Sequence, residues 1–150
     1  MKYTLSSTSN RIVRSEIREI LKWTRKPGVI SFGGGLPHSS LFPIEEIIDI
    51  TGDVLHNKGY LALQYGPTQG EGDMLEALVE HMAAYGETAT KEEICITSSS
   101  QQGLDLLSIL FLDPDSVVVM ELPSYLGSIQ AFKRCGADMR GVPMDEHGMD

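Results

Sequence analysis

A run of hydroxyl and amide side chains, Thr97 to Gln102, follows a short apolar segment and precedes a helical one. In open α/β sheets, ligands bind outside the carboxyl ends of the strands. A helix N-terminus offers unpaired backbone N–H groups and a partial positive charge, both of which favour a phosphate. Serine and threonine also cap helices where no ligand binds. The run is therefore compatible with a phosphate site and with a simple helix cap.

An aromatic ring follows the next apolar segment, in Pro123-Ser124-Tyr125. If both segments are parallel strands, Tyr125 and the hydroxyl run share one sheet edge. There the ring could stack on a planar cofactor, a contact worth about 0.5–1.5 kcal/mol beyond area burial. A core tyrosine at the start of a helix is the alternative.

Two further segments have turn-forming residues that a ligand could approach. The run Gly33-Gly34-Gly35-Leu36-Pro37 allows close backbone contact or positive φ. Its spacing is not that of a dinucleotide fingerprint, and a flexible turn is the default interpretation. Tyr65, within Gln64-Tyr65-Gly66-Pro67-Thr68, could be structural or could reach a ligand. The four histidines have no metal-ligand spacing among themselves or with the two cysteines.

Helical and extended segments alternate along the chain, and this order predicts an α/β fold. Proline, glycine and Asp113-Pro114 punctuate the elements. Leu75, Leu78, Val79 and Met82 should face inward. We expect helices over residues 9–26, 43–58, 73–85, 103–112 and from Pro123 through Phe132, and strands over 94–97, 117–120 and 139–142.

The three strands are expected to pair in parallel, with 117–120 buried on both faces. Cys95 should be a small buried side chain, and Cys135 should end a helix before Gly136. Three short strands do not complete a covered parallel sheet. We therefore expect the chain to stop within a domain, after a turn at 145–150.

Composition narrows the functional class. A formal net charge of −9 and the lack of a basic run argue against nucleic-acid binding. No stretch approaches the ~20 apolar residues that span a bilayer, and the first residues lack the apolar core of a signal peptide. Two cysteines do not form a disulfide framework. A cytoplasmic protein is expected, with no membrane partner.

Several segments, in their order and spacing, resemble the class I/II aminotransferases of fold type I, which depend on pyridoxal 5'-phosphate. The 2-aminoadipate and kynurenine multisubstrate aminotransferases are the most similar subgroup. The resemblance runs from about Ser9 to Asp150. It rests on the following segments: Ile17-Arg18-Glu19-Ile20-Leu21, Ile30-Ser31-Phe32, Gly34-Gly35-Leu36-Pro37, Leu41-Phe42-Pro43, Gln64-Tyr65-Gly66-Pro67-Thr68, Ser100-Gln101-Gln102-Gly103-Leu104-Asp105-Leu106 and Pro123-Ser124-Tyr125-Leu126-Gly127.

The resemblance implies the N-terminal part of the fold type I large domain, a mostly parallel sheet flanked by helices and preceded by a helical arm. Residues 1–43 would form the arm and the Gly-rich substrate-side segment, and 44–150 the incomplete cofactor domain. The family usually has glycine where Ser99 stands, so backbone approach to the phosphate would be tighter here. The implied cofactor-binding residues are Ser99, Ser100, Gln101, Tyr125 and, across a homodimer interface, Tyr65; the implied substrate-binding residues are Gly34, Gly35 and Arg18.

The resemblance also implies groups that are not in this sequence. In the family, the lysine that holds the cofactor as a Schiff base and the arginine that binds the substrate carboxylate lie beyond residue 150. None of the lysines present has the matching context. We therefore expect amino-group transfer between an amino acid and a 2-oxo acid from the complete protein, and inactivity of this chain alone. A non-catalytic ligand-binding module and a truncated gene product are the alternatives.

Overall fold

The computed structural model describes residues 3–12, 22–23, 26–30, 32 and 35–149. The chain forms two compact units. One combines Met1–Gly35 with Thr97–Asp150, and the other is Leu36–Ile96. The predicted division into residues 1–43 and 44–150 stays a prediction. Most of the predicted helix over 9–26 lies outside the described residues.

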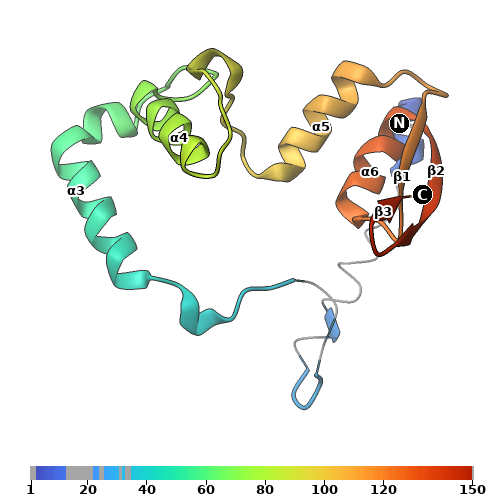
Figure 1. The fold of residues 1–150 in the computed structure, drawn as a ribbon, viewed down its shortest axis with the longest axis horizontal. Coiled ribbons are helices and arrows are strands. Elements are labelled where there is room, and N and C mark those ends of the chain that lie inside the picture. Colours follow the sequence, from blue (N-terminus) through green and yellow to red (C-terminus); the bar gives the residue numbers. More distant parts are fainter. Residues whose placement is uncertain (1–2, 13–21, 24–25, 31, 33–34, 150) are drawn as a thin grey trace. The chain divides into compact units, whose positions relative to one another are not determined.

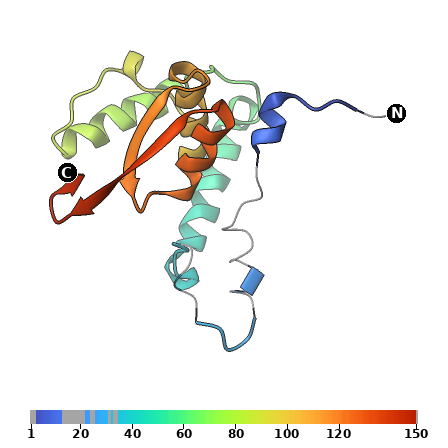
Figure 2. The same ribbon diagram turned by 90° about the vertical axis from the view of Figure 1, so that its right-hand side faces the viewer.

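The first unit is built on a strand–helix–strand motif (Figure 1). Strand β1 (Val117–Leu122) pairs in parallel with β2 (Asp138–Asp145), from Val117 opposite Asp138 to Leu122 opposite Pro143. Helix α6 (Leu126–Cys135) connects them and contacts β2, as Figure 2 shows. The turn predicted after Asp145 leads into a short strand, β3 (Gly148–Met149), antiparallel to β2. The α/β class is confirmed.

Two helices pack on α6 within this unit. Helix α5 (Ser100–Phe111) contacts its side, and α1 (Ser7–Arg11) contacts it near the C-terminus. Buried groups mark these contacts, since Ala131 of α6 is 2% exposed and Ser108 of α5 is 1% exposed. The Arg134 guanidinium lies 3.4 Å from the Asp105 carboxylate and links the two helices. Helix α6 is therefore the centre of the unit.

Helix α6 ends as its sequence predicts. Gly136 adopts φ 87°, and its N–H donates to the Lys133 carbonyl. This left-handed residue closes the helix at little cost because glycine has no Cβ. Cys135 is half-buried at the helix end, as expected.

The second unit contains helices α3 (Ile44–Ala62) and α4 (Gly72–Ala84) and the 3-10 turns η1 (Ser39–Leu41) and η2 (Lys91–Glu93). Helix α3 continues beyond its predicted end at Lys58, but Lys58 itself has non-helical φ −132° and ψ 19°, so the prediction marks a kink. Helix α4 confirms its prediction. Leu75 is buried, and Leu78, Val79 and Met82 are half-buried.

The predicted strand over 94–97 is wrong. The backbone groups of this segment form hydrogen bonds with Gln69, whereas those of a strand would bond to a neighbouring strand. The Ile96 N–H donates to the Gln69 carbonyl at 2.8 Å, and the Gln69 side-chain amide donates to the Ile94 carbonyl at 2.8 Å. Cys95 is exposed here, so its predicted burial is also wrong.

Strand β1 is not buried on both faces, contrary to the prediction. Val118 and Met120 are half-buried, while Val117 and Val119 remain 52% and 57% exposed. Exposure alternates because successive side chains point to opposite faces, and no described element covers the second face. No helix in the described part of the chain is long and apolar enough to cross a membrane.

Candidate functional site

The hydroxyl run forms a tight turn at the start of α5. Ser99 has φ 77° and ψ 166°, a region that favours glycine. Its N–H donates to the Thr97 carbonyl at 2.9 Å, while the Thr97 hydroxyl donates to the Ser99 carbonyl at 3.0 Å. The Gln102 side-chain carbonyl accepts from the Ser98 N–H. These local bonds fix the backbone direction with which the chain enters α5.

The turn leaves donors exposed at the helix N-terminus. Helix α5 begins at Ser100, earlier than the predicted Gly103, so Ser100 and Gln101 occupy its first turn. The N–H groups of first-turn residues have no acceptor within their own helix. The described residues place no acceptor on either N–H, and neither the Ser99 nor the Ser100 hydroxyl forms a hydrogen bond there. Two N–H groups, two hydroxyls and the helix dipole can thus meet an anion.

The same turn is connected to the start of α6. The Gln101 side-chain amide donates to the Gly127 carbonyl at 3.2 Å. Gly127 is buried, and a Cβ built on it would lie 2.5 Å from Gln101 Oε1 and 2.8 Å from Tyr125 Cζ. The structure therefore brings Gln101 and Tyr125 together around one glycine. The contact runs between α5 and α6 and not along a shared sheet edge, because the predicted strand over 94–97 does not form.

Tyr125 stands between β1 and α6, where it is the N-cap residue of the helix. The chain leaves β1 through a cis Leu122–Pro123 peptide bond. The Ser128 hydroxyl donates to the Tyr125 carbonyl at 2.7 Å and fixes the backbone at this point. One side of the ring lies against Gly127, yet the residue is 61% exposed. A held but exposed ring can stack on a planar ligand, so the core-tyrosine alternative does not describe it.

Gly127 is the residue of this cluster to which sequence reasoning assigned no role. A glycine within the first turn of an amphipathic helix is the signal that could have found it. Glycine has no Cβ, so its presence there allows another group to approach the backbone closely. Within the described residues, no group of three or more His, Cys, Asp or Glu could hold a metal ion.

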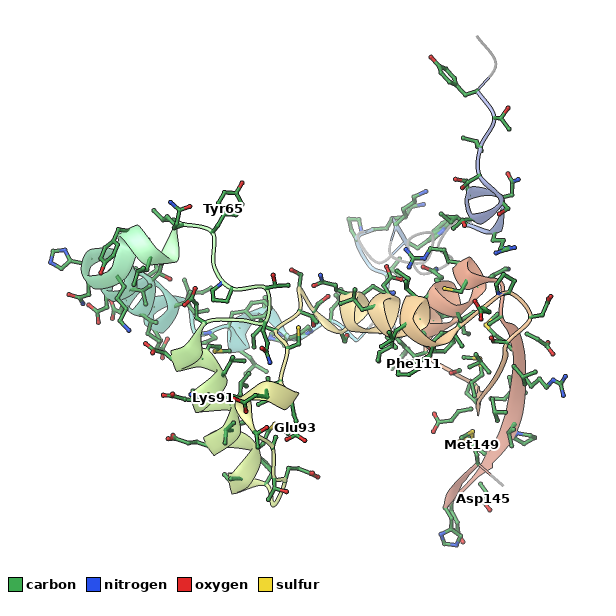
Figure 3. The ribbon with its side chains drawn as sticks, turned by 90° about the horizontal axis from the view of Figure 1, so that it is seen from above. Tyr65, Lys91, Glu93, Phe111, Asp145 and Met149 are labelled. Carbon is green, nitrogen blue, oxygen red and sulfur yellow. The ribbon has the colours of Figure 1, made fainter. Side chains whose placement is uncertain are left out.

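The other predicted site residues are less constrained. Tyr65 belongs to the second unit, where it is 100% exposed and its side chain projects from the loop before α4 (Figure 3). The Gln64 side chain accepts from the Tyr65 N–H at 2.9 Å. Gly35 is exposed, and a Cβ there would meet nothing within 4 Å. Gly34 and Arg18 lie outside the described residues.

Residues 28–150 match the family described as aminotransferase class I and II. The chain belongs to this family. It is 44% identical over 142 residues to a 2-aminoadipate transaminase of Thermus thermophilus, covering 95% of this chain and 34% of that protein. It is 43% identical over 137 residues to aromatic-amino-acid aminotransferase 1 of Thermococcus litoralis, covering 91% and 33%.

A solved structure gives the same result. The α-aminoadipate aminotransferase LysN of Thermus thermophilus, complexed with N-(5'-phosphopyridoxyl)-L-leucine, has a TM-score of 0.84 and 42% identity. The match covers 97% of this chain and 35% of that one. The chain thus spans about a third of the length of the curated aminotransferases it matches.

The clustered residues fit a ligand with a phosphate and an aromatic ring. The unpaired N–H groups of Ser100 and Gln101 suit the phosphate, and the Tyr125 ring lies beside Gly127, whose carbonyl accepts from the Gln101 side chain. Of the predicted cofactor residues, the structure joins Ser99, Ser100, Gln101 and Tyr125 in one unit.

Proposed function

We propose that this aminotransferase-family protein moves an amino group between an amino acid and a 2-oxo acid with pyridoxal 5'-phosphate, and that this chain supplies the part of the site that holds the phosphate and the ring. The observation that supports this most strongly is the hydrogen bond between Gln101 and Gly127. It joins the start of α5, where we propose the phosphate binds, to the glycine beside the exposed Tyr125 ring.

The residues of the first unit would divide the work of binding. The backbone N–H groups of Ser100 and Gln101 and the hydroxyls of Ser99 and Ser100 would hold the phosphate. Tyr125 would stack on the ring and set its tilt. When bound, the cofactor supplies an electron-withdrawing ring that stabilises negative charge at the carbon bearing the amino group. The Gln101 side chain already donates to Gly127, so its backbone would be its main contact with the phosphate.

The second unit and the N-terminal segment would complete the site. We propose that Tyr65 reaches the cofactor phosphate of a partner subunit in a homodimer, a role for which its full exposure is suited. Gly34, Gly35 and Arg18 would line the substrate position. The proposal places the protein in the cytoplasm. Cell fractionation would test the cytoplasmic location, and the mass of the purified assembly would test the homodimer.

The complete protein tests the activity. We expect amino transfer to 2-oxoglutarate from 2-aminoadipate, from aromatic amino acids, or from both, since relatives bearing both names match this chain. Tyr125→Ala should weaken cofactor binding, while Tyr60→Ala, a second exposed tyrosine outside the proposed site, should not. No transfer with any donor would overturn the proposal. Saturable cofactor binding without transfer would favour the ligand-binding alternative.

The chain of 150 residues gives a separate test. Since the family's lysine is not in it, we expect no amino transfer from this chain alone. Titration with pyridoxal 5'-phosphate, borohydride reduction and peptide mapping would show whether one lysine is labelled. Saturable labelling of a single lysine, or measurable transfer, would contradict the expectation. Random labelling of several lysines would support it.

A further inference from the structure

Gly127 lies where α5, α6 and the exposed ring meet. Its carbonyl accepts from the Gln101 side-chain amide at 3.2 Å, and its Cα side faces both the Gln101 amide oxygen and the Tyr125 ring. An added Cβ would come within 3.0 Å of both side chains. Cβ atoms do not tolerate such distances, so both side chains would have to move.

We propose that Gly127 is a positioning residue for the cofactor ring. Because Gly127 has no side chain, it leaves room for the Tyr125 ring beside the start of α6. Its carbonyl accepts from the Gln101 side chain and so links this position to α5. The inference rests on the proposed function, because the ring would be that of pyridoxal 5'-phosphate. It assigns the Gln101 side chain to the same task and leaves the phosphate to backbone groups and hydroxyls.

The proposal separates two kinds of binding. Inorganic phosphate would use the backbone N–H groups and hydroxyls at the start of α5, whereas the atoms nearest a methyl group at Gly127 belong to the Gln101 and Tyr125 side chains. A ligand with phosphate and ring would also need Tyr125 in place. The displaced stack is worth about 0.5–1.5 kcal/mol, which corresponds to a loss of affinity of about 2- to 12-fold. If Gly127 positions the ring, Gly127→Ala should weaken binding of the ligand that has a ring and leave phosphate binding unchanged. A general disruption of the site would weaken binding of both ligands.

The test uses the complete protein without cofactor and two probes, inorganic phosphate and 4-deoxypyridoxine 5'-phosphate. The second probe has the ring and the phosphate but lacks the aldehyde, so covalent attachment does not mask the stacking contribution. Calorimetry would measure both dissociation constants. For Gly127→Ala we expect about 2- to 12-fold weaker binding of the ring probe, and phosphate binding within about 2-fold of the wild type.

Gly103→Ala is the matched control. Gly103 lies in the same helix as Gln101, and a Cβ there would meet only the Thr97 hydroxyl, at 4.0 Å. Both probes should bind this variant as they bind the wild type. Equal binding of the ring probe by Gly127→Ala and Gly103→Ala would overturn the proposal, as would an equal loss of both probes in Gly127→Ala with retained fold.

Gln101→Met covers the case in which Gly127→Ala does not fold. Gln101 is exposed, and methionine keeps its length and backbone N–H while it removes the hydrogen bond to Gly127. We expect weaker ring-probe binding and unchanged phosphate binding. Weaker phosphate binding alone would refute the assignment of the Gln101 side chain. If the wild type binds neither probe, the proposed function itself fails.

Discussion

Replacement of Ser99 by glycine should stabilise the protein. Ser99 has φ 77° and ψ 166°, a region that is essentially restricted to glycine, and a strained residue of this kind costs about 1–3 kcal/mol. Its hydroxyl forms no capping bond that would be lost. Glycine adds unfolded-state entropy worth about 0.5–1 kcal/mol. The net gain in the free energy of unfolding should be about 0–2.5 kcal/mol.

Urea unfolding of the complete protein measures this gain. At an unchanged slope, the midpoint should rise by the gain in free energy divided by that slope. Ser98→Gly is the control, because Ser98 is not among the described residues with positive φ. It adds the same entropy, relieves no strain, and should lower the midpoint.

A third variant separates strain from the hydroxyl. Ser99→Ala keeps the strained backbone, so its stability should stay within about 0.5 kcal/mol of the wild type. If Ser99→Gly lowers the midpoint as far as Ser98→Gly does, the assignment of strain at Ser99 is refuted.

Three further perturbations test individual contacts. Gln69→Ala removes the donor to the Lys91 and Ile94 carbonyls and should cost about 1–3 kcal/mol by thermal unfolding, whereas Gln64→Ala on the exposed loop should cost less than about 0.5. Arg11→Ala removes the bond from the guanidinium to the Cys135 carbonyl at the end of α6, so limited proteolysis should release the N-terminal segment faster, with Lys26→Ala unchanged. The Thr90 N–H and then its hydroxyl lower the pKa of Glu93 below 4.5, so the stability it contributes is present above 4.5 and is lost as pH falls through the lowered value. An NMR titration should show that Thr90→Val raises this pKa only in part, because the backbone donor remains; full return to the ordinary value of a glutamate would show that the Thr90 N–H contributes nothing.

Sequence patterns predicted the elements whose structure depends on residues close together in the sequence. The spacing of Leu75, Leu78 and Val79 gave the buried face of α4, and Gly136 marked the end of α6. The segment over 94–97 failed because its partner is not local. Gln69, 25 residues before Ile94, supplies a side-chain donor that no periodicity reveals. An apolar run can be read as a strand, but its pairing depends on what lies beside it.

In the candidate site, too, the sequence did not predict a contact between residues far apart in the chain. Residue types and order placed Ser100, Gln101 and Tyr125 at the carboxyl ends of consecutive apolar segments, and the structure brings Gln101 and Tyr125 together. The sequence did not reveal that the Gln101 side chain is engaged with α6. That contact depends on the crossing of α5 and α6, which only the packed unit specifies.

Ser99 and Gly127 both stand at positions that favour glycine, Ser99 because of its φ and ψ at the turn into α5 and Gly127 because of the neighbouring Tyr125 ring and Gln101 side chain. At Gly127 the sequence provides the residue that the geometry requires. At Ser99 it provides a serine instead, which costs stability but adds a hydroxyl donor to the turn. If that hydroxyl binds phosphate, Ser99→Gly and Ser99→Ala should both weaken inorganic phosphate binding, although only Ser99→Gly stabilises the fold. Phosphate binding unchanged in both variants would show that the strained serine contributes nothing to the anion site.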